Sequence, residues 1–251
     1  MYLDYIAYHN KLVQVSIQEK LLLGGGCLLL ALVFPQVQVL SAIILLMHLV
    51  MIGAGVPARF LLQLWLVPLG FLLFSLGSLV FDWGSQPWGG QGFKIGNYYI
   101  WLAPQGLSSA WNLLMRCAAG TSCLFMIATT TPVVHIATFM ARLRWLHGIM
   151  DIVLLTYRFI FILLETAGRM LAAQQARLGY ANHRQSIQSF AVLIANLGGK
   201  SIGRANQLSI ALQARNYQGQ LFACLPAQVP KWWRVALIIV LLAGILLITR
   251  L

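Results

Sequence analysis

The sequence predicts an all-α integral membrane protein with about five transmembrane helices and a cytoplasmic region of two long helices and one short helix. Apolar residues make up 60% of the chain and charged residues 9%, a balance that soluble globular domains do not have. Several runs of about 20 residues carry almost no charge, which is the length that a helix needs to cross a bilayer. The net charge of +12 comes from basic residues placed singly between these runs, which indicates loops at a membrane surface and not a nucleic-acid site.

The first 20 residues are predicted to be a cytoplasmic segment that leads into the first crossing. Asp4 and Glu19 lie within it, and no continuous apolar stretch ends at a small-residue cleavage site, so it does not have the pattern of a signal peptide. Tyr2, Tyr5 and Tyr8 are suited to the interface between water and lipid.

The first two crossings are expected within residues 21–58, where no Asp, Glu, Lys or Arg occurs. The run is long enough for two helices, and Pro35 cannot continue the first one because proline lacks the backbone N–H and clashes with the preceding turn. Gln36 and Gln38 then supply a polar turn. The glycine run at residues 24–26 allows close helix contact or a local distortion.

Two further crossings are predicted at Phe60–Phe81, with a kink at Pro68, and at Leu107–Thr130. The connection between them, Asp82–Gln105, is expected outside, where Trp and Tyr side chains form an interfacial belt. The aromatic residues of this connection are Trp83, Trp88, Tyr98, Tyr99 and Trp101. A fifth crossing at Trp232–Leu247 leaves the N-terminus inside and the C-terminus outside.

Residues 132–230 form the predicted cytoplasmic region, between an N-terminal part at 1–131 and a C-terminal crossing at 231–251. Eleven of the 17 Lys and Arg residues lie between residues 132 and 234, in agreement with the positive charge of cytoplasmic segments. The helices of this region are predicted at Val133–Arg144, Ile149–Leu178 and Gln185–Tyr217.

The two long helices end in similar sequences, Gln175-Ala176-Arg177-Leu178 and Gln213-Ala214-Arg215-Asn216. A guanidinium at a helix C-terminus stabilises the helix by about 0.3–1 kcal/mol, because it lies beside the unpaired carbonyls of the last turn. One interpretation is therefore a pair of arginine-capped helices. The other is a pair of matched cationic ends that dock on a partner protein.

Small residues recur every four positions on both long helices. They are Gly168, Ala172 and Ala176 on the first helix, and Ala191, Ala195, Gly199 and Gly203 on the second. Residues four apart share a helix face, and small faces let two backbones approach closely. We therefore predict that the helices cross near Ala172 and Gly199, with arms that end in Arg177 and Arg215. The alternative is that Gly and Ala are simply common in membrane helices.

Arg116 lies in the middle of the fourth predicted crossing, where a charge is costly and often functional. With Asn112 one turn away, it is a possible intramembrane polar site, and the alternative is that it snorkels along a tilted helix. On the first long helix, Arg158, Glu165 and Arg169 share one face, for which we favour an intramolecular row of salt bridges.

The sequence predicts no catalytic, cofactor or metal site. The motifs GxxxxGK[ST], GxSxG and HExxH are absent, so the chain has no P-loop of its own for ATP. The histidines lack metal-ligand spacing, and the four cysteines form no CxxC pair.

Several stretches also resemble a known family. Residues 5–12 with 19–22, Tyr157-Arg158-Phe159, residues 172–177 and the two helix ends are similar to the cobalt and nickel branch of the transmembrane T components of energy-coupling factor transporters. The resemblance extends over nearly the whole chain. The family motif at each helix end is Ala-Arg-Gly, and this sequence has Leu178 and Asn216 at the glycine positions.

The resemblance implies a non-catalytic subunit of an importer of cobalt or nickel ions in the bacterial plasma or inner membrane. It implies docking of two cytoplasmic ABC ATPases on Ala176, Arg177 and Leu178 and on Ala214, Arg215 and Asn216. A separate membrane subunit would capture the substrate. Two other classes remain open: a membrane enzyme acting on a phosphate-bearing lipid, and a stand-alone secondary transporter. The first would need a base or nucleophile near the arginines, and the second discontinuous helices in matched halves.

Overall fold

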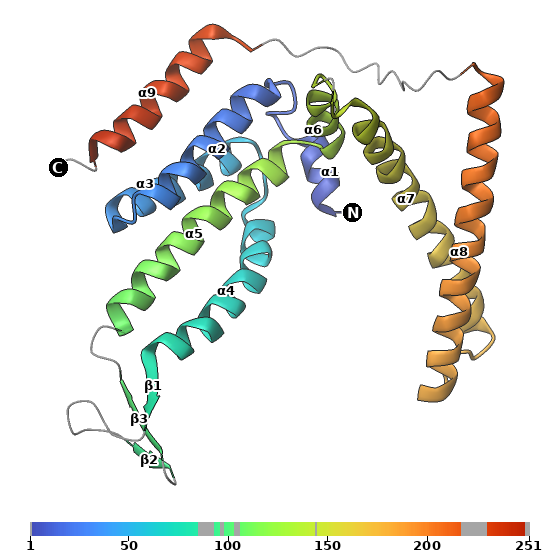
Figure 1. Cartoon of the computed structure of the whole chain (residues 1–251), viewed down its shortest axis with the longest axis horizontal. Helices are drawn as coiled ribbons and strands as arrows, with labels where there is room; N and C mark the ends of the chain where they lie inside the picture. The colour runs from blue at the N-terminus through green and yellow to red at the C-terminus, as the bar shows by residue number, and fades with distance from the viewer. Residues whose placement is uncertain are drawn as a thin grey trace. The chain divides into compact units, whose positions relative to one another are not determined.

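A computed structural model of the chain describes residues 2–84, 93–95, 98–102, 106–143, 145–216 and 230–248 (Figure 1). It divides into two compact units, Met1–Pro132 with Ala227–Leu251, and Val133–Pro226. We call the first the membrane unit and the second the hairpin unit. The helices of the membrane unit are α1 (Tyr2–His9), α2 (Ile17–Val33), α3 (Val37–Gly53), α4 (Ala58–Val80), α5 (Gly106–Thr130) and α9 (Trp232–Ile248).

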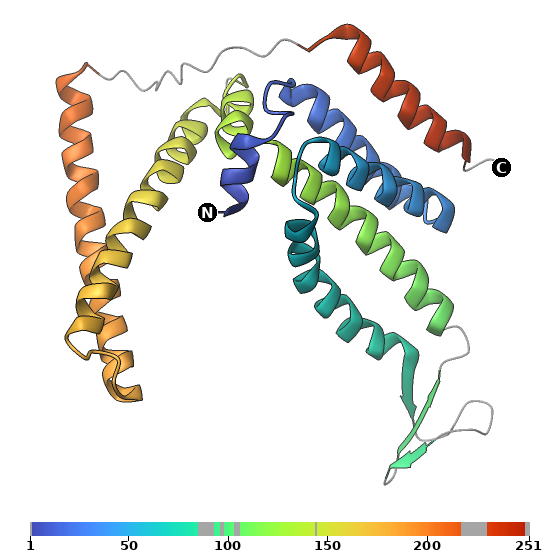
Figure 2. The ribbon, with the colours of Figure 1, turned by 180° about the vertical axis from the view of Figure 1, so that it is seen from behind.

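Helix α5 is the centre of the membrane unit. It packs against α1, α2, α3 and α4, while α9 packs against α2 and α3. Figures 1 and 2 show α5 in green between α4 and the pair α2 and α3. The core is made of side chains that are fully buried, among them Leu40, Ile43 and Met47 of α3 and Cys123 and Met126 of α5. Lipid tails are as apolar as these side chains, so close van der Waals packing of the buried side chains, and not their removal from water, favours the association of the helices.

The predicted all-α membrane fold is confirmed. Two helices, over Ala58–Gly77 and Ser108–Thr130, are long and apolar enough to cross a bilayer, and α3 and α9 are shorter apolar helices. The predicted break between the first two crossings is also present, because Phe34, Pro35 and Gln36 separate α2 from α3. The number of crossings and their direction stay predictions.

Pro68 lies inside α4, as the sequence predicts. Its ring clashes with the carbonyl one turn earlier and removes one helix hydrogen bond, which bends a helix on the N-terminal side of the proline. The first half of α4 bends in Figure 1.

The connection between α4 and α5 contains a small antiparallel sheet, which the sequence analysis did not predict. Its strands are β1 (Phe81–Gly84), β2 (Phe93–Ile95) and β3 (Tyr98–Leu102), in the order β1-β3-β2. Phe81 pairs with Leu102, and Ile95 pairs with Tyr98. Aromatic and β-branched residues favour strands, and they dominate β3. Trp88 lies outside the described residues, and the aromatic belt stays a prediction.

The glycines of α2 lie where other helices approach closely. A Cβ on Gly24 would come within 2.7 Å of Ile127 Cγ1 on α5, and one on Gly26 within 2.8 Å of Leu242 Cδ1 on α9. The predicted close contact at this glycine run is therefore present. A Cβ on Gly25 meets nothing within 4 Å.

We expect Gly24→Leu to lower the free energy of unfolding by about 1–3 kcal/mol, because the added side chain overpacks the contact between α2 and α5. Gly25→Leu is the matched control, since it adds the same atoms one residue away in open space. Thermal unfolding of the two purified variants in the same detergent measures the difference. Equal melting temperatures would contradict this packing of α2 on α5.

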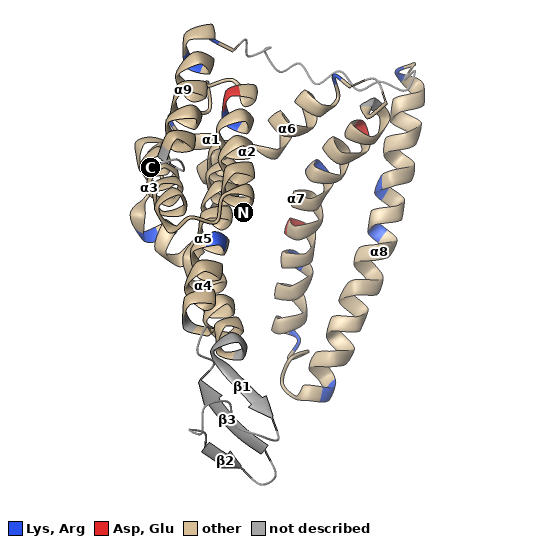
Figure 3. Cartoon of the chain, turned by 60° about the vertical axis from the view of Figure 1, so that its left-hand side comes forward, with Lys and Arg blue, Asp and Glu red and all other residues tan. Residues whose placement is uncertain are grey.

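The hairpin unit contains α6 (Val133–Met140), α7 (His147–Ala176) and α8 (His183–Ala214). Helix α6 packs against α7, and α7 packs against α8. A short connection joins α7 and α8, so the two long helices run antiparallel as a helical hairpin. Basic residues are spaced along both helices (Figure 3).

Candidate docking site at the ends of the long helices

Helix α7 ends in a Schellman motif. The N–H of Gly179 donates to Gln174 O at 2.9 Å, and the N–H of Leu178 donates to Gln175 O at 3.0 Å. This pattern requires a left-handed residue after the C-cap Arg177, and Leu178 adopts it with φ 55°. The turn therefore has the geometry that a motif glycine would give, although leucine occupies the position.

Helix α8 also ends in a left-handed residue after an arginine C-cap. Arg215 is its C-cap, the N–H of Asn216 donates to Gln213 O at 3.0 Å, and Asn216 has φ 57°. Asparagine adopts the left-handed conformation more readily than most residues, because its short polar side chain bonds locally. The two helix ends thus share the order alanine, arginine, left-handed residue. The left-handed residues have nearly the same φ angle.

Leu178 is held in an unfavourable conformation and is 75% exposed. A left-handed leucine costs roughly 1–2 kcal/mol, because its Cβ lies close to the following carbonyl oxygen. The next position is restricted to glycine, because a Cβ at residue 179 would come within 2.7 Å of Ser189 Oγ. The tip of the hairpin, where α7 turns into α8, therefore presents the exposed apolar side chain of Leu178 beside Arg177.

We expect Leu178→Gly to raise the free energy of unfolding by about 0.5–1 kcal/mol, because glycine removes the steric cost and loses part of the gain as chain entropy. Asn216→Gly should change stability less, because asparagine already tolerates the conformation. Denaturant titrations of the two variants in one detergent measure both values. A loss of stability in Leu178→Gly would contradict the left-handed turn.

Side-chain hydrogen bonds hold the tip of the hairpin. Gln174 accepts from Tyr180 Oη at 2.9 Å and donates to Ser189 O at 2.9 Å, while Ser189 Oγ donates to Gly179 O at 2.8 Å. These bonds link the last turn of α7 to the first turns of α8. A cavity of about 400 Å³ beside the tip is lined by Arg177, Leu178, Gln185, Gln188 and Val192, among others. The sequence alone indicates no role for Tyr180 or Ser189, because their contacts depend on how α8 folds back.

The guanidinium groups of Arg177 and Arg215 are exposed. In the part of the chain that the structure describes, neither forms a hydrogen bond or an ion pair, so neither caps its own helix through the side chain. Arg177 ends α7 beside the turn that leads into α8, and Arg215 ends α8. The 32 residues of α8 therefore separate them by about 48 Å.

The tight helix crossing predicted at the small residues is not present. A Cβ on Gly168, Gly199 or Gly203 would meet nothing within 4 Å, and Ala172 and Ala195 are exposed. The physical reason is that an open groove separates α7 from α8 in this region, and it is lined by long side chains as well as by Gly203. The long side chains include Arg169 and Met170 on α7 and Lys200 and Arg204 on α8.

Arg116 and Asn112 lie one turn apart on α5, and among the described residues no hydrogen bond joins them. Arg116 Nη2 donates to Leu32 O, a carbonyl in the last turn of α2. Such carbonyls have no partner within their own helix, so the guanidinium caps α2. Asn112 is exposed. The predicted pair of Glu165 and Arg169 is confirmed, with Oε1 and Nη2 3.2 Å apart.

A buried polar cluster, which the sequence analysis missed, closes the end of α5. Asn10 Nδ2 donates to Thr129 O at 3.1 Å and to Ala7 O at 2.8 Å, and Lys20 Nζ donates to Thr130 O at 2.8 Å. Both threonine carbonyls belong to the last turn of α5 and lack helical partners. The cluster therefore joins α1, α2 and α5 through groups far apart in the sequence.

Glu19 extends this cluster to α9. Its Oε1 accepts from the backbone N–H of Lys231 at 2.8 Å, and its Oε2 lies 3.8 Å from Arg234 Nη1. A carboxylate is stabilised at a helix N-terminus by the unpaired N–H groups and the helix dipole. Two adjacent charged residues, Glu19 and Lys20, beside an apolar run are the signal in the sequence for this cluster. The sequence does not show which distant groups they contact.

Among the described residues, no group of three or more His, Cys, Asp or Glu side chains could hold a metal ion. His48 instead makes local contacts. Its Nδ1 lies 2.8 Å from Ile44 O, and its Nε2 accepts from Trp65 Nε1 at 2.9 Å.

Comparisons with known proteins agree on one kind of protein. A family model named CbiQ and described as a cobalt transport protein matches residues 9–224. Cobalt transport protein CbiQ of Rhodobacter capsulatus is 36% identical over 220 residues, which cover 87% of this chain and 85% of that protein. Cobalt transport protein CbiQ of Salmonella typhimurium is 28% identical over 229 residues, covering 86% and 97%. A putative fused cobalt transport protein CbiMQ of Methanocorpusculum labreanum is 25% identical over 219 residues, covering 86% of this chain and 36% of that protein.

Proposed function

The chain belongs to the CbiQ family of cobalt transport proteins, and we propose that it is the energy-coupling transmembrane subunit of an ABC-type cobalt importer. In this proposal the subunit does not hydrolyse ATP. Two cytoplasmic ABC ATPases bind the ends of α7 and α8, and a separate membrane subunit captures the ion. The importer lies in the bacterial plasma or inner membrane, with the N-terminus of this chain in the cytoplasm.

One observation carries the proposal: the two long helices end in equivalent left-handed turns with exposed, unpaired guanidinium groups. About 48 Å of helix separates these groups, a distance that supports contact with two different ATPase molecules. An arginine can form two parallel hydrogen bonds to a carboxylate, which suits it to a docking contact. The name of the fused CbiMQ relative supports a second membrane partner, because that protein joins a related chain to another transport component.

In the proposed mechanism, the hairpin of α7 and α8 transmits motion from the ATPases to the membrane. We infer that the two ATPases approach each other when they bind ATP and displace the helix ends docked on them. The hydrogen bonds of Gln174, Tyr180 and Ser189 keep the tip together during this displacement. The motion of α7 and α8 then changes the surface on which the capture subunit binds. This surface would use the exposed apolar side chains of α8, among them Ile187, Ile194 and Ile202.

Uptake of radioactive cobalt by cells that lack other cobalt importers tests this function. The chain is co-expressed with the ATPase and the capture subunit, and in the control with an ATPase whose catalytic site has been inactivated. We expect uptake only with the active ATPase. Uptake at the full rate with the inactivated ATPase would indicate a secondary transporter and would contradict the proposal.

The proposed orientation predicts where an impermeant thiol reagent reacts. Single cysteines at Lys94 and His183, in a background without the native cysteines, should be labelled from opposite faces of the membrane. Residue 94 lies in β2 between α4 and α5, and residue 183 begins α8. Right-side-out and inverted vesicles distinguish the two faces, and labelling of both residues from the same face would rule out the five-crossing topology.

A further inference from the structure

A groove between α7 and α8 lies away from the docking ends and has no part in the proposed function. Its volume is about 810 Å³. Three cations line it, Arg169 from α7 and Lys200 and Arg204 from α8, together with the apolar side chains of Leu163 and Met170. The groove thus combines a cationic side with an apolar side.

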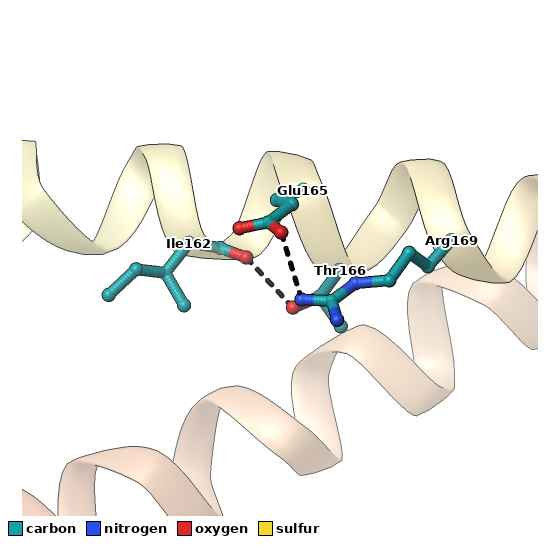
Figure 4. Close-up of polar contacts among 4 residues, drawn as sticks. All are labelled: Ile162, Glu165, Thr166 and Arg169. Atoms are coloured by element: carbon teal, nitrogen blue, oxygen red, sulfur yellow. Dashed lines mark hydrogen bonds and ion pairs between the residues drawn. The ribbon is translucent and has the colours of Figure 1, made fainter.

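The positive charge of the groove is largely uncompensated. Glu165 pairs with Arg169, and Figure 4 shows the contact beside Thr166, whose hydroxyl donates to Ile162 O. Both side chains of the pair are about 70% exposed, at 72% for Arg169 and 68% for Glu165, so the pair contributes little and leaves the guanidinium accessible. Within the described residues, neither Lys200 nor Arg204 has an ion-pair partner.

No acidic residue follows Glu165 in the sequence, so α8 itself carries no acid for these cations. Glu165 is the last acidic residue of the chain, and residues 166–251 contain nine Lys and Arg residues. Three cations against one carboxylate give the groove a formal charge of +2. The groove therefore favours the binding of an anion from outside the chain.

Lys200 and Arg204 are four residues apart and share one face of α8, so one phosphate group can contact both. The planar guanidinium of Arg204 can bind two phosphate oxygens at once, and the ammonium of Lys200 acts as a point charge. Leu163 and Met170 offer an apolar surface next to this position. A ligand that carries a phosphate next to an apolar part matches both sides of the groove.

We propose that the groove binds the headgroup phosphate of an anionic phospholipid, with the glycerol and first acyl carbons against Leu163 and Met170. The membrane nature of the protein makes such a lipid available at high local concentration. A zwitterionic lipid fits less well, because its own cation lies near three basic side chains. Anionic headgroups gain about fivefold in binding for each basic residue near them.

Native mass spectrometry of the full chain in detergent tests the proposal, with phosphatidylglycerol and phosphatidylcholine as probes. We expect the chain to retain phosphatidylglycerol in preference. Arg204→Gln should reduce this preference about fivefold, and Lys200→Gln with Arg204→Gln should remove it. Arg184→Gln is the matched control, because it removes the same charge from α8 outside the groove.

Three results would overturn the proposal. The first is equal retention of the two lipids by the unaltered chain. The second is an equal loss in Arg184→Gln and Arg204→Gln, which would show a general effect of charge. The third is complete displacement of the lipid by millimolar inorganic phosphate or by an acidic peptide, which would indicate a soluble anion or a protein segment as the occupant. Comparison of two lipids on the same sample keeps the result independent of how much of a variant folds.

Discussion

Replacing both Arg177 and Arg215 by alanine is expected to abolish co-purification of the ATPase with the chain and to abolish cobalt uptake. Both guanidinium groups are exposed and unpaired in the free chain. In a largely buried interface each would bond to carboxylates or carbonyls of an ATPase. Loss of one partner of such a pair costs about 2–5 kcal/mol, which is a factor of tens to thousands in affinity.

The two sites should also act together. Two ends bound to two ATPases make the assembly bivalent, so the double variant should lose far more than either single variant. Arginine to lysine should restore only part of the binding, because a point charge does not replace a planar group with two parallel hydrogen bonds. Arg184→Ala, also on α8, is the control for the lost charge. Assembly and uptake at the unaltered level in the double variant would contradict the docking of ATPases on these two helix ends.

The second large effect is expected at Lys20. Its side chain is buried in the membrane unit, and its ammonium donates to Thr130 O at the end of α5. Lys20→Met keeps most of the volume and leaves this carbonyl without its donor. Hydrogen bonds that involve a charged group contribute about 1.5–3 kcal/mol, so the free energy of unfolding should fall by that amount.

Lys11→Met is the matched control, because Lys11 is exposed and its described hydrogen bond is made by the backbone, to Ala54 O. Unfolding followed by tryptophan fluorescence in one detergent compares the variants. A similar melting temperature for the two would show that the Lys20 contact does not stabilise the end of α5.

The helices that the sequence predicts well are those with strong local signals. The uncharged run at residues 21–58, broken by Pro35, gives α2 and α3 at the expected place because a proline cannot continue a helix whatever surrounds it. The ends of α7 and α8 follow from the paired Gln-Ala-Arg sequences. Leu178 shows that the fold holds a left-handed turn there even without glycine.

The features that the sequence analysis missed depend on distant partners. Lys20 and Thr130 are 110 positions apart, and Glu19 and Lys231 are 212 apart, so no local pattern relates them. The small residues of α7 and α8 predicted a tight crossing, but spacing alone cannot say which face of a helix meets its neighbour. The small sheet between α4 and α5 had a usable signal, since Gly96 and Asn97 separate strands rich in aromatic residues.

The most direct test of the central claim is the composition of the complex extracted from native membranes, measured by native mass spectrometry. We expect this chain together with two ATPase subunits and a separate membrane subunit that captures the ion. The double replacement of Arg177 and Arg215 by alanine should release the ATPases while the chain stays in the membrane. An unaltered chain that is extracted intact and active in cobalt uptake, with no ATPase attached, would contradict the proposed role as an energy-coupling subunit.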